Sequence, residues 1–492
     1  MRLAAGILCA LSLCLGSCAR SESTPAPDGT GGRDGATAVT PGSGGAAGAM
    51  PAPDDAGAGG DASPAPGGSG GSSGSGGSGG SGGSDASAPL PPVDGGPAAD
   101  AGPAPSAGVH IVFPPPGAAS SQTIVVRGTA TFASAIGAVR VNGTTATTSD
   151  AFATFRAVVP LALGDNVIAV SAEDETGGAL GAAQVTVRRF ADDGSIQRGG
   201  GDPFSLFSLS GFFVDDEQRD AIICDTIFDG LVRIDLATGD RSLASASESS
   251  AKGMVGSGYN DIGDPRDVAL DRPGHALLVD GGNIVGVDLA TGDRTLLSGP
   301  TVGTGPMAVR YFGVGVDSAG HRTIALDFQG NALFAVDAAT GNRSVLSSAT
   351  LGNGRAFNGY ETMELDLDHH RALTTQAYAN PIIAIDLVTG DRSVLSGDMA
   401  GSGPALGEPT ALAIAPAAGL VFAWDQMTKR LVAVELATGN RRVLADATTG
   451  MGAALPATIE HLAFGHDLLY ARANGVMLAV DPLEGHRVVV SR

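Results

Sequence analysis

The chain has 492 residues, of which 51 are acidic and 29 basic, and its formal net charge is −22. This length predicts two or three domains. The acidic balance argues against a nucleic-acid-binding protein, because binding phosphates takes clustered Lys and Arg. Only Cys224 lies beyond the first eighteen residues, which excludes a disulfide framework within the body of the chain. Its apolar surroundings predict a small buried side chain.

The first eighteen residues have the features of an export signal. Arg2 precedes an apolar stretch from Leu3 to Leu15, which is too short to span a bilayer. It ends in Leu-Gly-Ser-Cys at 15–18, which resembles the lipobox of bacterial lipoproteins; the alternative is an ordinary secretory signal with a chance cysteine. The resemblance implies cleavage before Cys18, acylation of Cys18 and a membrane anchor. Because Ala19 follows rather than Asp, it also implies sorting to the outer membrane.

Residues 19–107 consist mainly of Gly, Ser, Ala, Pro and Asp. Such a segment cannot bury enough apolar surface to offset the entropy of ordering, so we expect a disordered tether. Residues 108–190 change to short β-branched runs separated by turn residues, with Asn142-Gly143 suited to a tight hairpin turn. These runs predict a small antiparallel β-sandwich. It resembles the bacterial immunoglobulin-like modules that follow lipoprotein tethers, which implies a spacer or adhesion role.

Residues 191–492 contain six copies of one unit. The phrase Ile-Asp-Leu-Ala-Thr-Gly-Asp-Arg at 234–241 recurs, with changes, at steps of 53, 49, 49, 49 and 46 residues. Each copy contains four short strand patterns and no helical periodicity, which predicts a blade of a β-propeller. The fold class is therefore all-β, with an immunoglobulin-like sandwich followed by a six-bladed propeller. We expect residues 191–202 to supply any strand that closes the ring.

The repeat texture resembles the six-bladed propellers that include NHL-repeat proteins and the SMP-30/gluconolactonase-like family. The repeated Thr-Gly-Asp/Asn-Arg phrase is itself predicted to be structural, since it joins the third strand to the fourth, where a hairpin needs Gly. Its arginines begin equivalent outer strands, where each is expected to pair with a nearby acid. They are Arg241, Arg294, Arg343, Arg392, Arg441 and Arg487.

Function is expected where the copies differ, at the channel rim shared by the ends of the second strands and the starts of the innermost strands. The candidate ligand-binding residues at the second-strand ends are Asp225, Asp280, Asp327, Gln376, Asp425 and Arg472, with Trp424 beside them. The innermost-strand starts offer Ser210, Arg266, Asp267, Tyr311, Tyr360, Glu361, Thr410, Glu460 and His461. For the Asp set, an alternative interpretation is that each carboxylate only anchors the neighbouring loop.

Two function classes remain open. The first is a binding module at the cell envelope, whose propeller face binds a protein or a polymer. The second is a metal-dependent hydrolase or lactonase, which the SMP-30-like resemblance implies. Asp280, Asp425 and Glu361 could then hold a divalent cation such as Ca²⁺, with Glu361 and His461 as catalytic candidates. No Ser-His-Asp set, metal-spaced His or Cys cluster or phosphate loop is evident in the sequence, which favours the binding module.

Overall fold

The structure is a computed structural model that describes residues 107–201, 211–259, 262–357, 359–376, 379–397, 399–473 and 475–492. These residues all belong to one compact unit, Gly95–Arg492. They form strands and three single-turn 3-10 helices, η1 (Asp193–Ser195), η2 (Leu367–His369) and η3 (Pro416–Ala418). None of the helices in these ranges has the length and apolar character needed to cross a bilayer. The expectations for the leader, Cys18 and the tether, and for Ser210, lie outside the described residues.

Eight strands form an N-terminal module, residues 108–189. They are β1 (Gly108–Phe113), β2 (Gly117–Ala119), β3 (Thr123–Thr131), β4 (Ile136–Val141), β5 (Thr144–Thr145), β6 (Thr154–Pro160), β7 (Gly164–Asp174) and β8 (Ala179–Arg189). One sheet has the order β1-β3-β6, and the other contains β2-β8-β7-β4-β5. Asn142 and Gly143 form the β4–β5 turn with φ of 47° and 80°, which confirms the predicted tight turn. Apolar residues of both sheets share one core.

The remaining strands form six antiparallel four-stranded groups, which we call repeat sheets 1 to 6 and list from the inner strand outwards. Sheet 1 has β9 (Phe212–Asp215), β10 (Asp220–Asp225), β11 (Gly230–Asp235) and β12 (Arg241–Ala246). Sheet 2 has β13 (Pro265–Arg272), β14 (His275–Asp280), β15 (Asn283–Asp288) and β16 (Arg294–Ser298). Sheet 3 has β17 (Tyr311–Asp317), β18 (Arg322–Asp327), β19 (Ala332–Asp337) and β20 (Arg343–Ser348).

Sheet 4 has β21 (Tyr360–Asp366), β22 (Arg371–Gln376), β23 (Ile382–Asp386) and β24 (Arg392–Ser396). Sheet 5 has β25 (Pro409–Ala415), β26 (Leu420–Asp425), β27 (Arg430–Glu435) and β28 (Arg441–Ala445). Sheet 6 has β29 (His461–Gly465), β30 (Leu468–Ala473), β31 (Val476–Val480) and β32 (Arg487–Ser491). The chain is thus all-β, and its repeated four-stranded sheets are compatible with a propeller.

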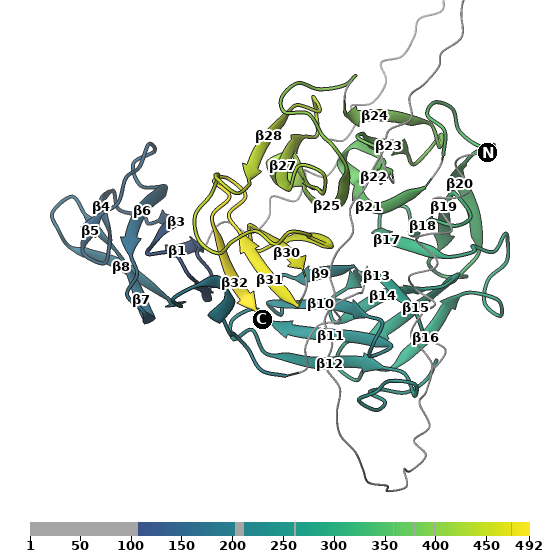
Figure 1. Ribbon diagram of the computed structural model, residues 1–492, viewed down its shortest axis with the longest axis horizontal. Coiled ribbons are helices and arrows are strands. Elements are labelled where there is room, and N and C mark those ends of the chain that lie inside the picture. Colours follow the sequence, from purple (N-terminus) through teal and green to yellow (C-terminus); the bar gives the residue numbers. More distant parts are fainter. Residues whose placement is uncertain are drawn as a thin grey trace, which may run out of the picture. The chain divides into compact units, whose positions relative to one another are not determined.

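The inner strands lie next to one another in chain order. Contacts join β9 to β13, β13 to β17, β17 to β21, β21 to β25 and β25 to β29, and β29 also contacts β9 (Figure 1). A hydrophobic cluster lies between each pair of neighbouring sheets, and the cluster between sheets 1 and 6 also includes the core of the N-terminal module. Burial on both faces is why the second and third strands are nearly continuous apolar runs. Cys224 is a free, buried member of the cluster between sheets 1 and 2, as its apolar surroundings predicted.

The repeated Thr-Gly-Asp/Asn-Arg phrase joins neighbouring sheets. In sheet 3, Gly341 has φ of 70° and its carbonyl accepts a hydrogen bond of 2.8 Å from Ser298 Oγ of sheet 2. Arg343 is buried and donates to Ser298 Oγ and to the carbonyls of Gly299, Val302 and Pro306. The structural role is therefore confirmed. Arg343 donates to carbonyls and a hydroxyl instead of pairing with the expected acid, because the guanidinium lies inside the joint, where chain segments turn.

Of residues 191–202, which were expected to supply a closing strand, the described ones (191–201) form no strand. Residues 196–201 lie instead between the first and last sheets. Arg198 donates through Nε to the Val490 carbonyl (3.0 Å), and its own carbonyl accepts from the Arg492 amide (2.9 Å). The Gly200 carbonyl accepts from the Arg241 amide of sheet 1. This segment and its neighbour Gly239, which accepts from Ser491 Oγ, reproduce the joint found between the other sheets.

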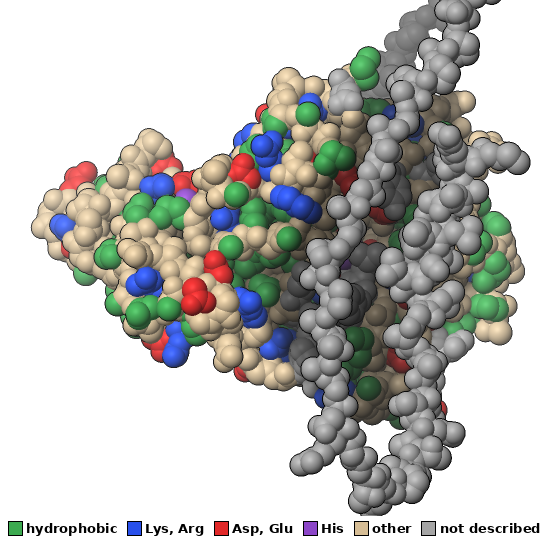
Figure 2. All heavy atoms as spheres, in the orientation of Figure 1, with side chains coloured by type: hydrophobic (Ala, Val, Ile, Leu, Met, Phe, Trp, Pro, Cys, Tyr) green, Lys and Arg blue, Asp and Glu red, His purple; other side chains and the backbone are tan. Residues whose placement is uncertain are grey.

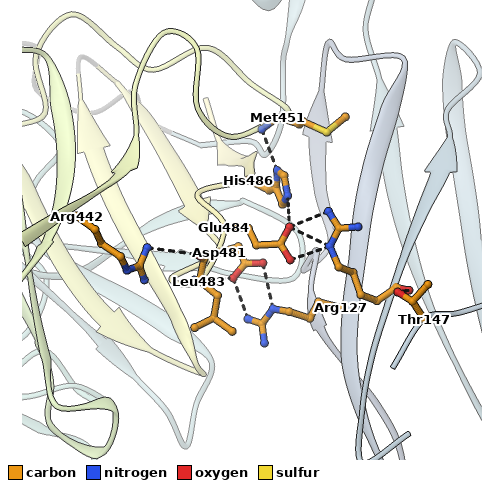
Figure 3. Close-up of polar contacts among 9 residues, drawn as sticks. Arg127, Thr147, Arg442, Met451, Asp481, Leu483, Glu484 and His486 are labelled. Carbon is orange, nitrogen blue, oxygen red and sulfur yellow. Dashed lines mark hydrogen bonds and ion pairs between the residues drawn. The ribbon is translucent and has the colours of Figure 1, made fainter. Parts of the chain in front are cut away.

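The N-terminal module is joined to sheet 6 by strands and by ion pairs. β2 pairs with β8 on one side and with β32 on the other, which makes one nine-stranded sheet. Arg127 forms a two-bonded pair with the buried carboxylate of Asp481 at 2.9 and 3.1 Å. Arg156 binds Glu484 at 2.7 Å, and Glu484 also contacts His486 at 2.8 Å (Figure 3). The module therefore packs directly against sheet 6 and is not a separate domain on a linker.

Candidate functional site

The candidate site is the rim, by which we mean the starts of the inner strands and the ends of the second strands. Strand register brings these together: Pro265 pairs with Asp280, Tyr311 with Asp327, and Pro409 with Asp425. The pairing confirms that the two sets share an edge of each sheet. Figure 2 shows acidic, basic and apolar side chains interspersed over the drawn face, outside the grey atoms. Surface charge on that face therefore selects no particular partner.

Three carboxylates that end second strands hold the loop before the inner strand of their own sheet. Asp280 accepts from the Asp264 amide at 2.6 Å. Asp327 accepts from the amides of Val309 and Arg310 at 2.7 and 3.0 Å. Asp425 accepts from those of Gly407 and Glu408 at 2.8 and 2.9 Å. Burial alone would raise the pKa of Asp425, but these hydrogen bonds outweigh it and lower that pKa.

The structure therefore favours the loop-anchor interpretation of the Asp set. Asp225 is fully buried and accepts from the amides of Ile227 and Phe228 at 2.8 and 3.2 Å, which holds the turn after β10. Asp280, Asp327 and Asp425 are exposed by 6%, 1% and 0%. A ligand in solution cannot reach side chains buried to this extent without moving the loops that they hold.

The other second-strand candidates differ in accessibility. Trp424 is fully buried and donates through its indole N–H to Gln426 at 2.7 Å, so it offers no ring face for a ligand to stack on. Arg472 is also fully buried, and it lies 3.4 Å from Glu460. Burial lowers the pKa of Arg472, against the opposing effect of Glu460. Gln376 is partly exposed and accepts from Arg355 at 3.2 Å, so among these residues it remains available at the surface.

The inner-strand candidates differ in accessibility, and Tyr311 and Tyr360 are buried, with exposed fractions of 0% and 1%. Glu361 is partly exposed, and burial together with the charge of Glu408 raises its pKa to about 6. His461 begins β29 and pairs in register with Arg472. Asp267 accepts from the Val314 amide at 2.9 Å, and burial raises its pKa to about 7. Burial, and then the charge of Asp267, also raise the pKa of Glu364. Burial thus brings the pKa values of Glu361 and Asp267 closer to neutrality than those of ordinary carboxylates.

The proposed metal ligands are not brought together. Across the ranges that the structure describes, no group of three or more His, Cys, Asp or Glu side chains could hold a metal ion. Asp280 and Asp425 bind loop amides in different sheets, whereas Glu361 neighbours Glu408. The arrangement of these residues gives the metal-dependent alternative no support.

Besides the carboxylates that hold the loops, a β-bulge recurs near the start of the inner strands. In sheets 2 to 5 a β-bulge follows the first paired residue, between Pro265 and Asp267, Tyr311 and Gly313, Tyr360 and Met363, and Pro409 and Ala411. A bulge leaves a residue outside the ladder and re-aims its side chain. The bulged positions hold Arg266, Phe312, Glu361 with Thr362, and Thr410. The same backbone feature thus carries different chemistry in each sheet.

The anchored loops supply further side chains that sequence reasoning missed. Asp264, Arg310 and Glu408 occupy the equivalent position in sheets 2, 3 and 5, directly before the first paired residue. Aligning sheets 2, 3 and 5 on the Asp that ends the second strand would have revealed this position, because the Asp is the same in all three sheets whereas the residue before the inner strand differs. Sequence alone could not show that the Asp carboxylate at the end of the second strand accepts hydrogen bonds from the backbone of this loop.

A groove of about 760 Å³ lies elsewhere, between the N-terminal module and the turns of sheets 1 and 6. Its walls include His110, Arg219, His466 and Tyr470. Unlike the rim, these walls are not built from equivalent positions of successive sheets. We therefore place the candidate site at the rim, where position-equivalent residues vary in chemistry.

Comparison with known proteins gives no family. No family model matches the chain, and no curated protein does. Among solved structures, an auxiliary nutrient binding protein from Bacteroides ovatus is 14% identical, with a TM-score of 0.42, over 75% of this chain and 96% of that one. A putative phosphatase from Bacteroides thetaiotaomicron is 11% identical, with a TM-score of 0.42, over 78% and 98%. Likenesses at this level carry no argument about what the chain does.

Proposed function

We propose that the chain is an exported, lipid-anchored binding protein of the cell envelope, whose ligand site is the rim of a six-bladed β-propeller. In this proposal the six repeat sheets are the blades, and the N-terminal module is an immunoglobulin-like domain. Support for the ring comes from the contacts between successive inner strands and from the contact of β29 with β9. The joint around Arg198 and Gly239 supports it further, since it repeats the joint between other sheets.

One observation carries the binding function. In sheets 2, 3 and 5 a buried carboxylate fixes the loop before the inner strand, and a bulge follows at the same place. A rigid frame that presents Asp264, Arg310 and Glu408 at equivalent points suits recognition, because binding gains from side chains that are already positioned. A catalytic set would instead require a nucleophile, base or metal group converging on one point.

Anchoring is proposed from the first eighteen residues, which resemble a lipoprotein leader ending at Cys18. Acyl chains on Cys18 would hold the chain on the outer membrane, and the Gly/Ser-rich segment 19–107 would separate the folded part from the lipid. The ligand in this proposal is a protein or polymer segment or a smaller solute that reaches the rim from solution. Nucleic acid is not among the proposed ligands.

The proposal is tested by binding of the full-length chain to arrays of glycans and peptides. We expect specific binders, and we expect the variants Glu408→Ala and Arg310→Ala each to weaken at least one of them about tenfold or more. Arg188→Ala, in an exposed ion pair of the N-terminal module, is the control and should leave binding unchanged. Binders that are insensitive to both rim variants, or no binders at all, would refute a ligand site at the rim.

A further inference from the structure

Two arginines at the rim surround one aromatic ring. The guanidinium carbons of Arg266 and Arg310 lie 5.3 and 5.4 Å from the ring centroid of Phe312. The Phe312 ring in turn stacks on Phe328, with centroids 4.5 Å apart and planes inclined by 10°. Arginine on an aromatic face is held flat by cation–π attraction. The planar guanidinium groups are therefore fixed before any ligand arrives.

A single carboxylate serves both arginines. Asp264 lies 2.5 Å from Arg266 and also forms an ion pair with Arg310. We call Asp264, Arg266, Arg310, Phe312 and Phe328 the arginine cluster. Within the cluster two guanidinium charges face one carboxylate, and the carboxylates of Asp280 and Asp327 lie beside it on the amides of Asp264 and Arg310. The side chains of Arg266, Arg310 and Asp264 are exposed by 16%, 29% and 32%, so the cluster is partly desolvated yet open to solution.

The cluster retains hydrogen-bonding capacity. Each guanidinium has five N–H donors, whereas Asp264 has two oxygens to share between both. Nε of Arg266 is buried and has no hydrogen-bond partner among the described residues. A buried donor without a partner costs free energy that a suitable acceptor would recover. An oxygen of an anionic group would match the remaining donors of the two partly exposed guanidinium groups.

We propose that the arginine cluster binds the carboxylate of a monoanionic ligand. This inference rests on the proposed function, because it assigns a chemical group to one part of the same rim. A planar carboxylate matches the guanidinium fork, and the neighbouring carboxylates of Asp280 and Asp327 disfavour a dianionic phosphate more than a monoanion.

Two acids in another part of the rim bear on the orientation of such a ligand. Glu361 and Glu408, from sheets 4 and 5, are close enough for the charge of Glu408 to raise the pKa of Glu361. These acids repel a second anionic group, so the rest of the ligand is neutral or cationic where it faces them. The rim thus prefers a monocarboxylate to a polyanion.

The test uses acetate as the probe and the Nε–H NMR signals of arginine in the full-length chain as the readout. Acetate replaces chloride at constant ionic strength, and Arg266→Lys and Arg310→Lys identify the two signals. We expect a saturable shift of both signals in the wild type, and a weakening of about tenfold in Arg310→Gln. Sulfate should shift them less than acetate does at equal ionic strength.

Arg188→Gln is the control, since Arg188 lies in an exposed pair outside the rim. An unchanged urea midpoint for Arg310→Gln shows that the variant is folded. A linear, unsaturable shift, or the same response in wild type and Arg310→Gln, would overturn the proposal. The two proposals fail separately: without acetate binding, array binders that depend on Glu408 would still support the rim as the ligand site.

Discussion

Charged side chains in this protein have several distinct tasks, which depend on how deeply each is buried. Buried Arg343 ties two sheets through carbonyl and hydroxyl acceptors, and buried Asp327 fixes a loop backbone. Partly exposed Arg266 and Arg310 share one carboxylate at the rim. A buried ionised group is tolerated only where hydrogen bonds replace the lost water. The residue type alone therefore does not reveal the role, and burial separates anchors from candidate binding groups.

The Arg156–Glu484 pair gives a prediction at the residue scale. Hydrogen bonds from Arg156 lower the pKa of Glu484 to about 2, against the opposing effect of burial. Because the folded-state pKa is depressed, the stabilisation is fully present above the ordinary pKa of 4.5 and is lost as the pH falls towards 2. The two side chains are exposed by 42% and 32%, so solvent screening limits the contribution to about 1 kcal/mol.

Urea unfolding of wild type and Glu484→Gln should therefore differ by about 1 kcal/mol at pH 6, and the difference should shrink between about pH 4.5 and 2. The control is the same comparison in an Arg156→Gln background, where the pH-dependent difference should shrink to the part that His486 contributes. A difference that is constant across this pH range, or that is undiminished in the Arg156→Gln background, would contradict the assigned cause.

At the scale of elements, each repeat has the same hairpin turn between its third and fourth strands, whereas its residues at the rim differ from repeat to repeat. Gly341 lies in the turn between β19 and β20 with φ of 70°, and a Cβ there would lie 2.1 Å from the Leu297 carbonyl oxygen of sheet 2. Glycine is thus required twice, for the left-handed backbone and for the close approach of the neighbouring sheet. Gly274 has nearly the same φ, 72°, but nothing lies within 4 Å of its Cβ position.

This difference predicts unequal costs of the same substitution. Gly274→Ala should lower the free energy of unfolding by about 1–2 kcal/mol, the cost of the left-handed conformation. Gly341→Ala should lower it by at least about 3 kcal/mol, because the backbone of sheet 2 must also move. Urea denaturation followed by circular dichroism measures both. Equal losses would show that Gly341 does not lie in a joint between sheets.

Much of the element level was predictable from the sequence. The recurring phrase predicted four strands per copy, and Asn142-Gly143 predicted a hairpin turn that the structure contains. Local patterns encode both features, since strand alternation and positive φ depend on neighbouring residues. The direction in which Asp280 or Asp425 points is not local, because their acceptor role depends on loop amides some 17 residues away in the chain. Bulges at Arg266 and Phe312 were likewise invisible, since they arise from the pairing of two strands.

At the scale of the molecule, the N-terminal module and the repeat sheets share one sheet and one hydrophobic cluster. β2 continues sheet 6 beyond its outer strand, and Phe113 and Val187 of the module belong to the same cluster as Tyr470 of sheet 6. Covering the edge of β32 removes a free strand edge, which is a common site of unwanted association. The sequence predicted a spacer, but a cluster built from residues hundreds of positions apart follows only from the folded arrangement.

The central claim is that six repeat sheets close into a ring with one rim. Val214 of β9 and Gly465 of β29 lie at the joint of the first and last sheets, where a Cβ on Gly465 would be 2.8 Å from that of Val214. A disulfide between cysteines at these positions needs only about 1 Å of relaxation. Gly313→Cys with Met363→Cys is the matched control, because the corresponding distance of 2.9 Å joins adjacent sheets 3 and 4.

The deciding measurement is peptide mass spectrometry of the oxidised full-length variant Val214→Cys/Gly465→Cys without reductant. A closed ring predicts a linked peptide joining residues 214 and 465 in high yield, as for the control pair. An open row of sheets would link only the control pair, and that result would contradict the ring and the shared rim on which the binding site depends.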